Sequence, residues 1–336
     1  MYKIEKVSFN NYNPNKSFNK GINNYNSKIQ SMNFQSQKAV NLNKEIYSDF
    51  QSIYNISMDY SHSIDIPKSI WKKNSGPTSN PSIVITDENG NVLASKNPYD
   101  LREGASTTKV FVGYAAIKLL DPINDVIICT EYAENIPYIG KSDVVVGQKM
   151  SVIEAATKNF PMSSNVTTAN IAIAIGKKYT NCKTDEEAYI KGMEIINEFI
   201  KQSGCINTYL PNSSGVNYDH ISKTWLYDNG YATDKNGISA NDLALITIEA
   251  MNDENFLNSY ASNTNSINAS LAKDKSIDGL FWIKSGTQGY NHSIYGFNKD
   301  GKRYYISFLG VNTEQDGGNY QEFAQDIYEW ASEEIL

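Results

Sequence analysis

Apolar residues follow two different spacings along this 336-residue chain, and each spacing predicts a different kind of element. Short apolar runs bounded by turn residues lie near residue 90 and after residue 279, which is typical of strands. Between these two regions, and again at the end of the chain, apolar residues recur every three or four positions, which predicts helices. The pattern therefore predicts strands from two distant parts of the chain with a helical segment between them.

The predicted strands fall into two groups. Residues 82–86 and 91–95 flank a turn that ends at Gly90, and so form a hairpin. Three further strands are predicted at residues 279–283, 292–297 and 303–310. Because consecutive strands joined by short turns pair antiparallel, we expect both groups to share one antiparallel sheet.

The predicted helices surround this sheet. Residues 108–120 are apolar nearly all round, which marks a buried core helix. Further helices are predicted from residue 151, at 169–175 with a stop at Gly176, from 184 to about 204, at 241–251 and at 320–335. We therefore predict an α+β fold, in which terminal helices flank an antiparallel sheet and an all-helical subdomain is inserted at about residues 121–250.

Residues 1–65 differ in composition from the rest of the chain. They are rich in Asn, Ser, Tyr and Lys and poor in aliphatic residues. We expect a polar N-terminal extension that is partly flexible, or a docked helix at residues 38–54, with the main folded domain at 66–336. The first 18 residues contain no continuous apolar segment, so we expect no secretory signal peptide.

Charge and composition exclude several classes of function. The net charge of −7 argues against a nucleic-acid partner. Three cysteines and three histidines are scattered without metal-ligand spacing, so we expect neither a metal nor another cofactor. No apolar run reaches the roughly 18–20 residues that span a bilayer, so we expect no membrane span.

The first candidate for chemistry is the Ser-Thr-Thr-Lys segment at residues 106–109, which opens the predicted core helix. Three-residue spacing places Ser106 and Lys109 on one helical face. A serine hydroxyl is a weak nucleophile until a base takes its proton, and a lysine amine can be that base when burial or a second cation lowers its pKa. We therefore expect Ser106 to be the nucleophile and Lys109 its base.

Two later segments supply the remaining groups. Ser163 and Asn165 lie in a turn between helices, where a hydroxyl can relay a proton and an amide can orient a lysine and the substrate. Lys284, Ser285, Gly286 and Thr287 close a predicted strand, where the lysine adds a second cation and the glycine allows a ligand backbone to approach. The backbone N–H groups of Ser106 and Thr287 would form an oxyanion hole.

In this order, the three segments match the S-x-x-K, S-x-N and K-T/S-G set of β-lactamases and penicillin-binding proteins. From about residue 81 to its end, the sequence resembles the low-molecular-mass penicillin-binding proteins, the D-alanyl-D-alanine carboxypeptidases of peptidase family S11. The hairpin before Ser106, the Asn-Ser-Ser-Gly-Val segment at 212–216 and the segment at 237–244 carry the resemblance further. Departures from the family pattern are Ser285 for threonine and Ser213-Ser214 for Pro-His.

The resemblance implies a β-lactamase/transpeptidase-like fold and a serine DD-peptidase, specifically a D-Ala-D-Ala carboxypeptidase. It implies peptidoglycan stem peptides as substrates, β-lactams as covalent inhibitors of Ser106, and a site of action on the cell-wall side of a bacterium. Ser106, Lys109, Ser163, Asn165 and Lys284 would be catalytic. Ser285, Gly286 and Thr287 would bind the substrate.

Other functions remain open at this point. A transpeptidase, esterase or peptide-tailoring acyltransferase could use the same groups. A β-lactamase is less favoured, because the segment at 194–198 has the wrong spacing for a deacylating Glu-x-x-x-Asn loop and is predicted to be helical. A non-catalytic binding protein is disfavoured because all five catalytic side chains are present.

Overall fold

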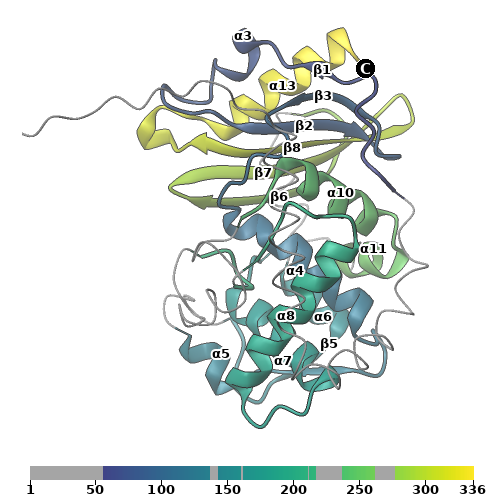
Figure 1. Ribbon diagram of the computed structural model, residues 1–336, viewed down its shortest axis with the longest axis vertical. Coiled ribbons are helices and arrows are strands. Elements are labelled where there is room, and N and C mark those ends of the chain that lie inside the picture. Colours follow the sequence, from purple (N-terminus) through teal and green to yellow (C-terminus); the bar gives the residue numbers. More distant parts are fainter. Residues whose placement is uncertain (1–55, 137–142, 160–161, 211, 217–236, 262–276) are drawn as a thin grey trace, which may run out of the picture. The chain divides into compact units, whose positions relative to one another are not determined.

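The computed structural model describes residues 56–136, 143–159, 162–210, 212–216, 237–261 and 277–336. The helix predicted at residues 38–54 lies outside this part of the chain. The described elements form a sheet covered on both faces, with a helical block below it in Figure 1. These layers confirm the predicted α+β class.

The main sheet has six strands in the order β1-β3-β2-β8-β7-β6. The strands are β1 (Ile64–Asp65), β2 (Ser82–Asp87), β3 (Val92–Lys96), β6 (Leu280–Gln288), β7 (Tyr290–Lys299) and β8 (Lys302–Asn312). All neighbours pair antiparallel except β1, which runs parallel to β3. The hairpin near residue 90 and the strands after residue 279 therefore share one sheet, as predicted, and β6 lies at its edge.

One face of the sheet packs against the last helix, α13 (Tyr320–Glu334), near α3 (Lys68–Trp71) (Figure 1). Phe323, Ile327 and Ala331 of α13 recur at helical spacing and are completely buried. They join Ile306 and Phe308 of β8 in one hydrophobic cluster of buried residues. Burial of this apolar stripe explains why the C-terminal segment forms a helix against the sheet.

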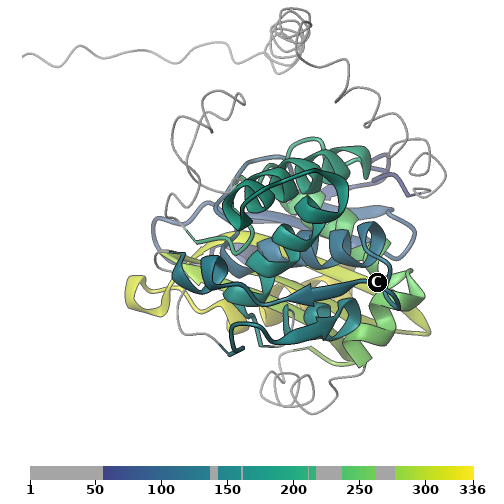
Figure 2. The same cartoon turned by 90° about the horizontal axis from the view of Figure 1, so that it is seen from below.

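The opposite face of the sheet packs against α10 (Ala240–Met251), and α4 (Thr108–Leu119) lies below it in the block. Every residue of α4 except Lys118 is buried. Around α4 lie α6 (Val152–Asn159), α7 (Asn165–Tyr179), α8 (Asp185–Gln202) and α11 (Glu254–Ala261). Figure 2 shows this block from below, with its helices in front of the sheet. The segment that is apolar nearly all round thus forms α4, the buried helix at the centre of the block, as predicted.

The block differs from the prediction in two places. Besides the short helix α5 (Glu131–Asn135), it contains a two-stranded antiparallel sheet formed by β4 (Val126–Ile128) and β5 (Lys149–Ser151). The helix expected to stop at Gly176 continues to Tyr179. A Cβ at Gly176 would lie 1.8 Å from the carbonyl oxygen of Ala188, so this glycine allows α7 and α8 to pack closely and does not end α7.

No helix in the described part of the chain is both long and apolar enough to cross a membrane. The same residues contain no group of three or more His, Cys, Asp or Glu side chains placed to hold a metal ion.

Candidate active site

Ser106 lies in a tight turn at the start of α4, a helix that is buried along nearly its whole length. It is the middle residue of a 3₁₀ turn, η1 (Ala105–Thr107), that runs directly into α4. Ala105 has a positive φ of 43°, an uncommon conformation that costs on the order of 1–3 kcal/mol for a residue with a side chain. Since α4 is buried along its length, the turn has a rigid support, and it leaves the Ser106 side chain partly exposed.

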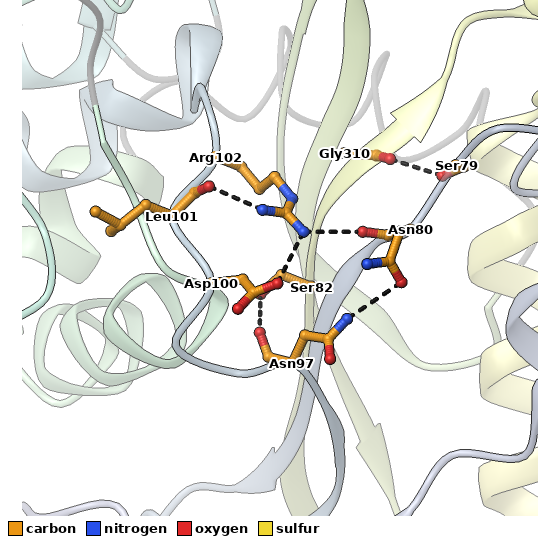
Figure 3. A network of polar contacts seen from close by, with 8 residues as sticks. All are labelled: Ser79, Asn80, Ser82, Asn97, Asp100, Leu101, Arg102 and Gly310. Carbon is orange, nitrogen blue, oxygen red and sulfur yellow. Dashed lines mark hydrogen bonds and ion pairs between the residues drawn. The ribbon is translucent and has the colours of Figure 1, made fainter. Parts of the chain in front are cut away.

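The segment that leads into this turn is held by Arg102 (Figure 3). The Arg102 guanidinium donates to the backbone oxygens of Leu101 (3.0 Å) and Asn80 (3.1 Å) and to the Asp100 carboxylate (3.0 Å). Its backbone pairs with that of Ile238, which joins the lead-in to the start of α10. The turn is therefore anchored to both the sheet and the helical layer.

Lys109 points from the first turn of α4 back toward Ser106 and is completely buried. Its Nζ lies 3.0 Å from the Ser106 Oγ and 2.9 Å from the backbone oxygen of Ser214. Burial, and secondarily the nearby charge of Lys284, holds the pKa of Lys109 well below its usual range. A neutral amine next to a serine hydroxyl can accept the hydroxyl proton.

The Ser214 carbonyl is presented by a compact loop at residues 212–216. The Asn212 Oδ1 accepts hydrogen bonds from the backbone N–H groups of Ser214 (3.2 Å) and Gly215 (2.8 Å). Gly215 has a φ of +80°, and a Cβ there would lie 1.8 Å from the Ala105 oxygen. Only glycine permits this approach, so the loop packs directly against the nucleophile turn. The sequence showed the loop, but not that its backbone oxygen contacts Lys109.

Ser163 lies in a second strained turn, with a φ of +54°, just before α7. Its neighbour Ser164 caps α7 by accepting from the Thr167 N–H (3.2 Å) and donates its hydroxyl proton to the Asp143 carboxylate. Asn165 is the first residue of α7. The turn thus places Ser163 and Asn165 side by side at the start of a helix.

Asn159 is a buried residue that links this turn to α4, and nothing in the sequence singled it out. Its Nδ2 donates to the backbone oxygen of Lys109 (2.8 Å), and its Oδ1 accepts from the Thr168 hydroxyl (2.6 Å). The Thr168 Oγ1 also lies 2.5 Å from the Ser164 backbone oxygen, so the two acceptors share its one proton. The serine turn and the lysine helix are therefore joined through one buried amide.

The third segment lies on the edge strand β6. Lys284 is 5% exposed, and its Nζ lies 3.1 Å from the Ser163 Oγ and 3.0 Å from the Ser285 oxygen. Burial lowers its pKa to about 7. A Cβ on Gly286 would lie 2.4 Å from the backbone nitrogen of Ser106, so β6 passes directly over the nucleophile's N–H. Thr287 follows and is exposed.

The structure therefore brings Ser106, Lys109, Ser163 and Lys284 together, and two buried lysines each contact a serine hydroxyl. Ser106 pairs with Lys109, Ser163 pairs with Lys284, and the two lysines are close enough for one to lower the pKa of the other. Both side-chain pairs lie where β6 meets the helical block. The arrangement suits attack by Ser106 on a carbonyl carbon, with proton transfer through amines and hydroxyls.

Comparison with known proteins gives a match in structure but none in sequence. No family model matches the chain, and a search of curated protein sequences finds no match. Solved structures of the same fold include a D-alanyl-D-alanine carboxypeptidase from Mycobacterium tuberculosis H37Rv, with 17% identity, a TM-score of 0.58, and coverage of 81% of this chain and 95% of the other. Penicillin-binding protein 6B from Escherichia coli has 18% identity, a TM-score of 0.59, and coverage of 83% and 82%.

A third solved structure is the Streptomyces K15 DD-transpeptidase, with 16% identity, a TM-score of 0.57, and coverage of 77% of this chain and 99% of the other. The fold of this chain is thus that of penicillin-binding proteins and DD-peptidases. At these identities the likeness shows the fold. What the site does has to be argued from its own residues.

Proposed function

We propose that the chain is a serine DD-peptidase that forms an acyl-enzyme on Ser106 and is acylated there by β-lactams. The observation that carries the proposal is the completely buried Lys109, whose Nζ lies 3.0 Å from the Ser106 Oγ. Desolvation lowers the pKa of this amine well below its usual range and so favours the neutral form, which can act as a base. The fold shared with DD-peptidases supports D-Ala-D-Ala peptides of the peptidoglycan type as the substrate class.

In the proposed reaction, Lys109 takes the Ser106 proton while Oγ bonds to the carbonyl carbon of the penultimate residue. The backbone N–H groups of Ser106 and Thr287 hold the oxyanion. When the C–N bond breaks, Ser163 gives its proton to the leaving nitrogen and is reprotonated from Lys284, 3.1 Å away. Asn165 orients the acyl chain, and Ser285 and Gly286 bind the substrate along β6.

Water then attacks the ester, which releases the shortened peptide and returns the proton to Ser106. With a terminal D-alanine as the leaving residue, this is the D-Ala-D-Ala carboxypeptidase reaction that the resemblance implies. An amine in place of water would give transpeptidation by the same acyl-enzyme.

A β-lactamase is the weaker alternative. Rapid deacylation needs a group that activates water beside the ester. The segment at 194–198, which was considered for this role from its sequence, is part of α8. The Asn197 side chain there donates to the backbone oxygens of Met193 and Leu210. Measured turnover of a chromogenic cephalosporin separates this alternative from a slowly hydrolysed acyl-enzyme.

The proposal is tested by intact-mass spectrometry after incubation with a labelled penicillin. One adduct per chain is expected, located on Ser106 and absent in Ser106→Ala. The matched control is Ser151→Ala, which removes the exposed hydroxyl that accepts from the Glu154 N–H and should still be labelled. Labelling of Ser106→Ala at the wild-type level would overturn the assignment of the nucleophile.

A further inference from the structure

Lys109 can act as a base only if its amine presents a lone pair, and not an N–H, to Ser106. A neutral amine has two N–H bonds and one lone pair. An N–H donated to the Ser214 backbone oxygen, 2.9 Å from Nζ, leaves the lone pair for the Ser106 hydroxyl at 3.0 Å. The position of the Ser214 carbonyl therefore decides how the base is oriented toward the nucleophile.

Tyr189 of α8 holds the residue that precedes this carbonyl. The Ser213 N–H donates to the Tyr189 hydroxyl oxygen at 3.1 Å, and the Ser213 Oγ lies 3.3 Å from the same oxygen. Tyr189 and Ser213 are each 1% exposed, so water does not replace these contacts when they are lost. Because Ser213 and Ser214 are adjacent in the chain, a shift of Ser213 moves the carbonyl that meets Lys109.

Tyr189 is itself fixed, because α8 packs backbone to backbone against α7 on both sides of it. A Cβ on Gly176 would lie 1.8 Å from a backbone oxygen of α8, one position before Tyr189. A Cβ on Gly192, three positions after Tyr189, would lie 1.8 Å from a backbone oxygen of α7. The hydroxyl is therefore presented from the same helix pair that carries Asn165 at the start of α7.

We propose that Tyr189 is a positioning residue for the general base. Its hydroxyl holds the backbone at Ser213, so that the Ser214 carbonyl meets the Lys109 amine. The family pattern that the sequence resembles has proline in place of Ser213, and proline has no N–H that needs an acceptor. In this chain the N–H is present and buried, and Tyr189 accepts it. The inference rests on the proposed function, since Tyr189 acts through Lys109.

The test is Tyr189→Phe, which keeps the ring and removes the hydroxyl. We expect the rate constant for acylation of Ser106 by a labelled penicillin, measured on the folded fraction, to fall by about fivefold or more. We also expect the acidic limb of its pH profile to move to lower pH. A carbonyl that accepts from an ammonium favours the charged form, so its withdrawal lowers the pKa of Lys109 further, while the facing charge of Lys284 is unchanged.

The matched control is Tyr132→Phe. The Tyr132 ring packs against Tyr189 with ring centroids 6.1 Å apart, and within the described residues its hydroxyl has no hydrogen bond to the loop at 212–216. This variant should keep both the wild-type rate and the wild-type acidic limb. A role of Tyr189 in stability alone would lower the amount of folded protein and leave the limb of the folded fraction in place.

An unchanged rate in Tyr189→Phe, or a slower rate with the acidic limb unmoved, would overturn the inference and leave the proposed function standing. Wild-type protein that is not labelled at Ser106 would refute the proposed function, and the inference with it. If Tyr189→Phe does not fold, Ser213→Ala decides, because it removes the 3.3 Å contact and keeps the N–H contact. A shift of its acidic limb to lower pH supports the inference, and an unmoved limb overturns it.

Discussion

The buried ammonium of Lys284 should make the site costly for stability at neutral pH, and Lys284→Met should reveal the size of this cost. Burial lowers the pKa of Lys284 from 10.5 to about 7. A difference of this size between the unfolded and folded states corresponds to about 5 kcal/mol when the lysine is charged in both. Lys284→Met removes the ammonium and keeps an unbranched apolar chain of similar length.

The sign follows from proton binding. Between pH 7 and 10.5 the unfolded chain binds more protons at Lys284 than the folded protein does, so the free energy of unfolding of the wild type rises with pH in this window. Over pH 7 to 9 the wild type should gain about 2 kcal/mol relative to Lys284→Met. The cost is nearly complete at pH 7 and is fully present about one pH unit lower, and Lys284→Met should be the more stable protein there although it is inactive.

The measurement is urea unfolding of both proteins at pH 7, 8 and 9. The control is Lys191→Met, which removes an exposed lysine that is ion-paired with Glu194 on the same helix and should differ from the wild type by the same amount at each pH. A difference between wild type and Lys284→Met that stays constant from pH 7 to 9 would refute the burial of a titrating amine at this position.

Two glycines give further predictions. Gly215→Ala should displace the Ser214 carbonyl from Lys109, because its Cβ would lie 1.8 Å from a backbone oxygen. Penicillin acylation measured by stopped flow should then slow by about tenfold or more. Acylation at the wild-type rate would contradict the packing of this loop. Gly176→Ala should force α7 away from α8 and lower the free energy of unfolding, measured in urea, by about 1–3 kcal/mol. The rate of Ser106 acylation should be much less affected. An unchanged free energy of unfolding would contradict the close contact between the two helices.

The sequence was sufficient to predict those helices and strands whose pattern of apolar residues matches the place that they take in the folded protein. The apolar residues of α4 predicted a buried helix, the short apolar runs after residue 279 predicted strands of a sheet, and both formed where expected. Ser106 and Lys109 could be paired in advance because helix geometry fixes residues three positions apart. The resemblance predicted that Lys284 joins the site as a second cation, but its contact with Ser163 was not predicted, since no local rule joins residues 121 positions apart.

What could not be predicted depends on contacts between backbones. Gly176 looked like a helix stop, because a glycine in a helix usually weakens it, but here the missing side chain is replaced by the backbone of α8. Asn159 and the Ser214 carbonyl serve the site through one side-chain amide and one backbone oxygen, and neither leaves a periodic or motif signal. The β4–β5 pair has three-residue strands, too short for an alternating pattern to stand out.

The strained turns at Ala105 and Ser163 explain why the site lies where several parts of the fold meet. Each turn holds a residue with a side chain at positive φ, a conformation that persists only when its surroundings determine it. Around Ser106 those surroundings are Gly286 of the edge strand, Gly215 of the loop, and the backbone pair between Arg102 and Ile238. Each is a backbone contact that a side chain cannot adjust. Because all three hold the segment that carries Ser106, loosening any one of them should reduce acylation before it reduces the overall stability of the fold.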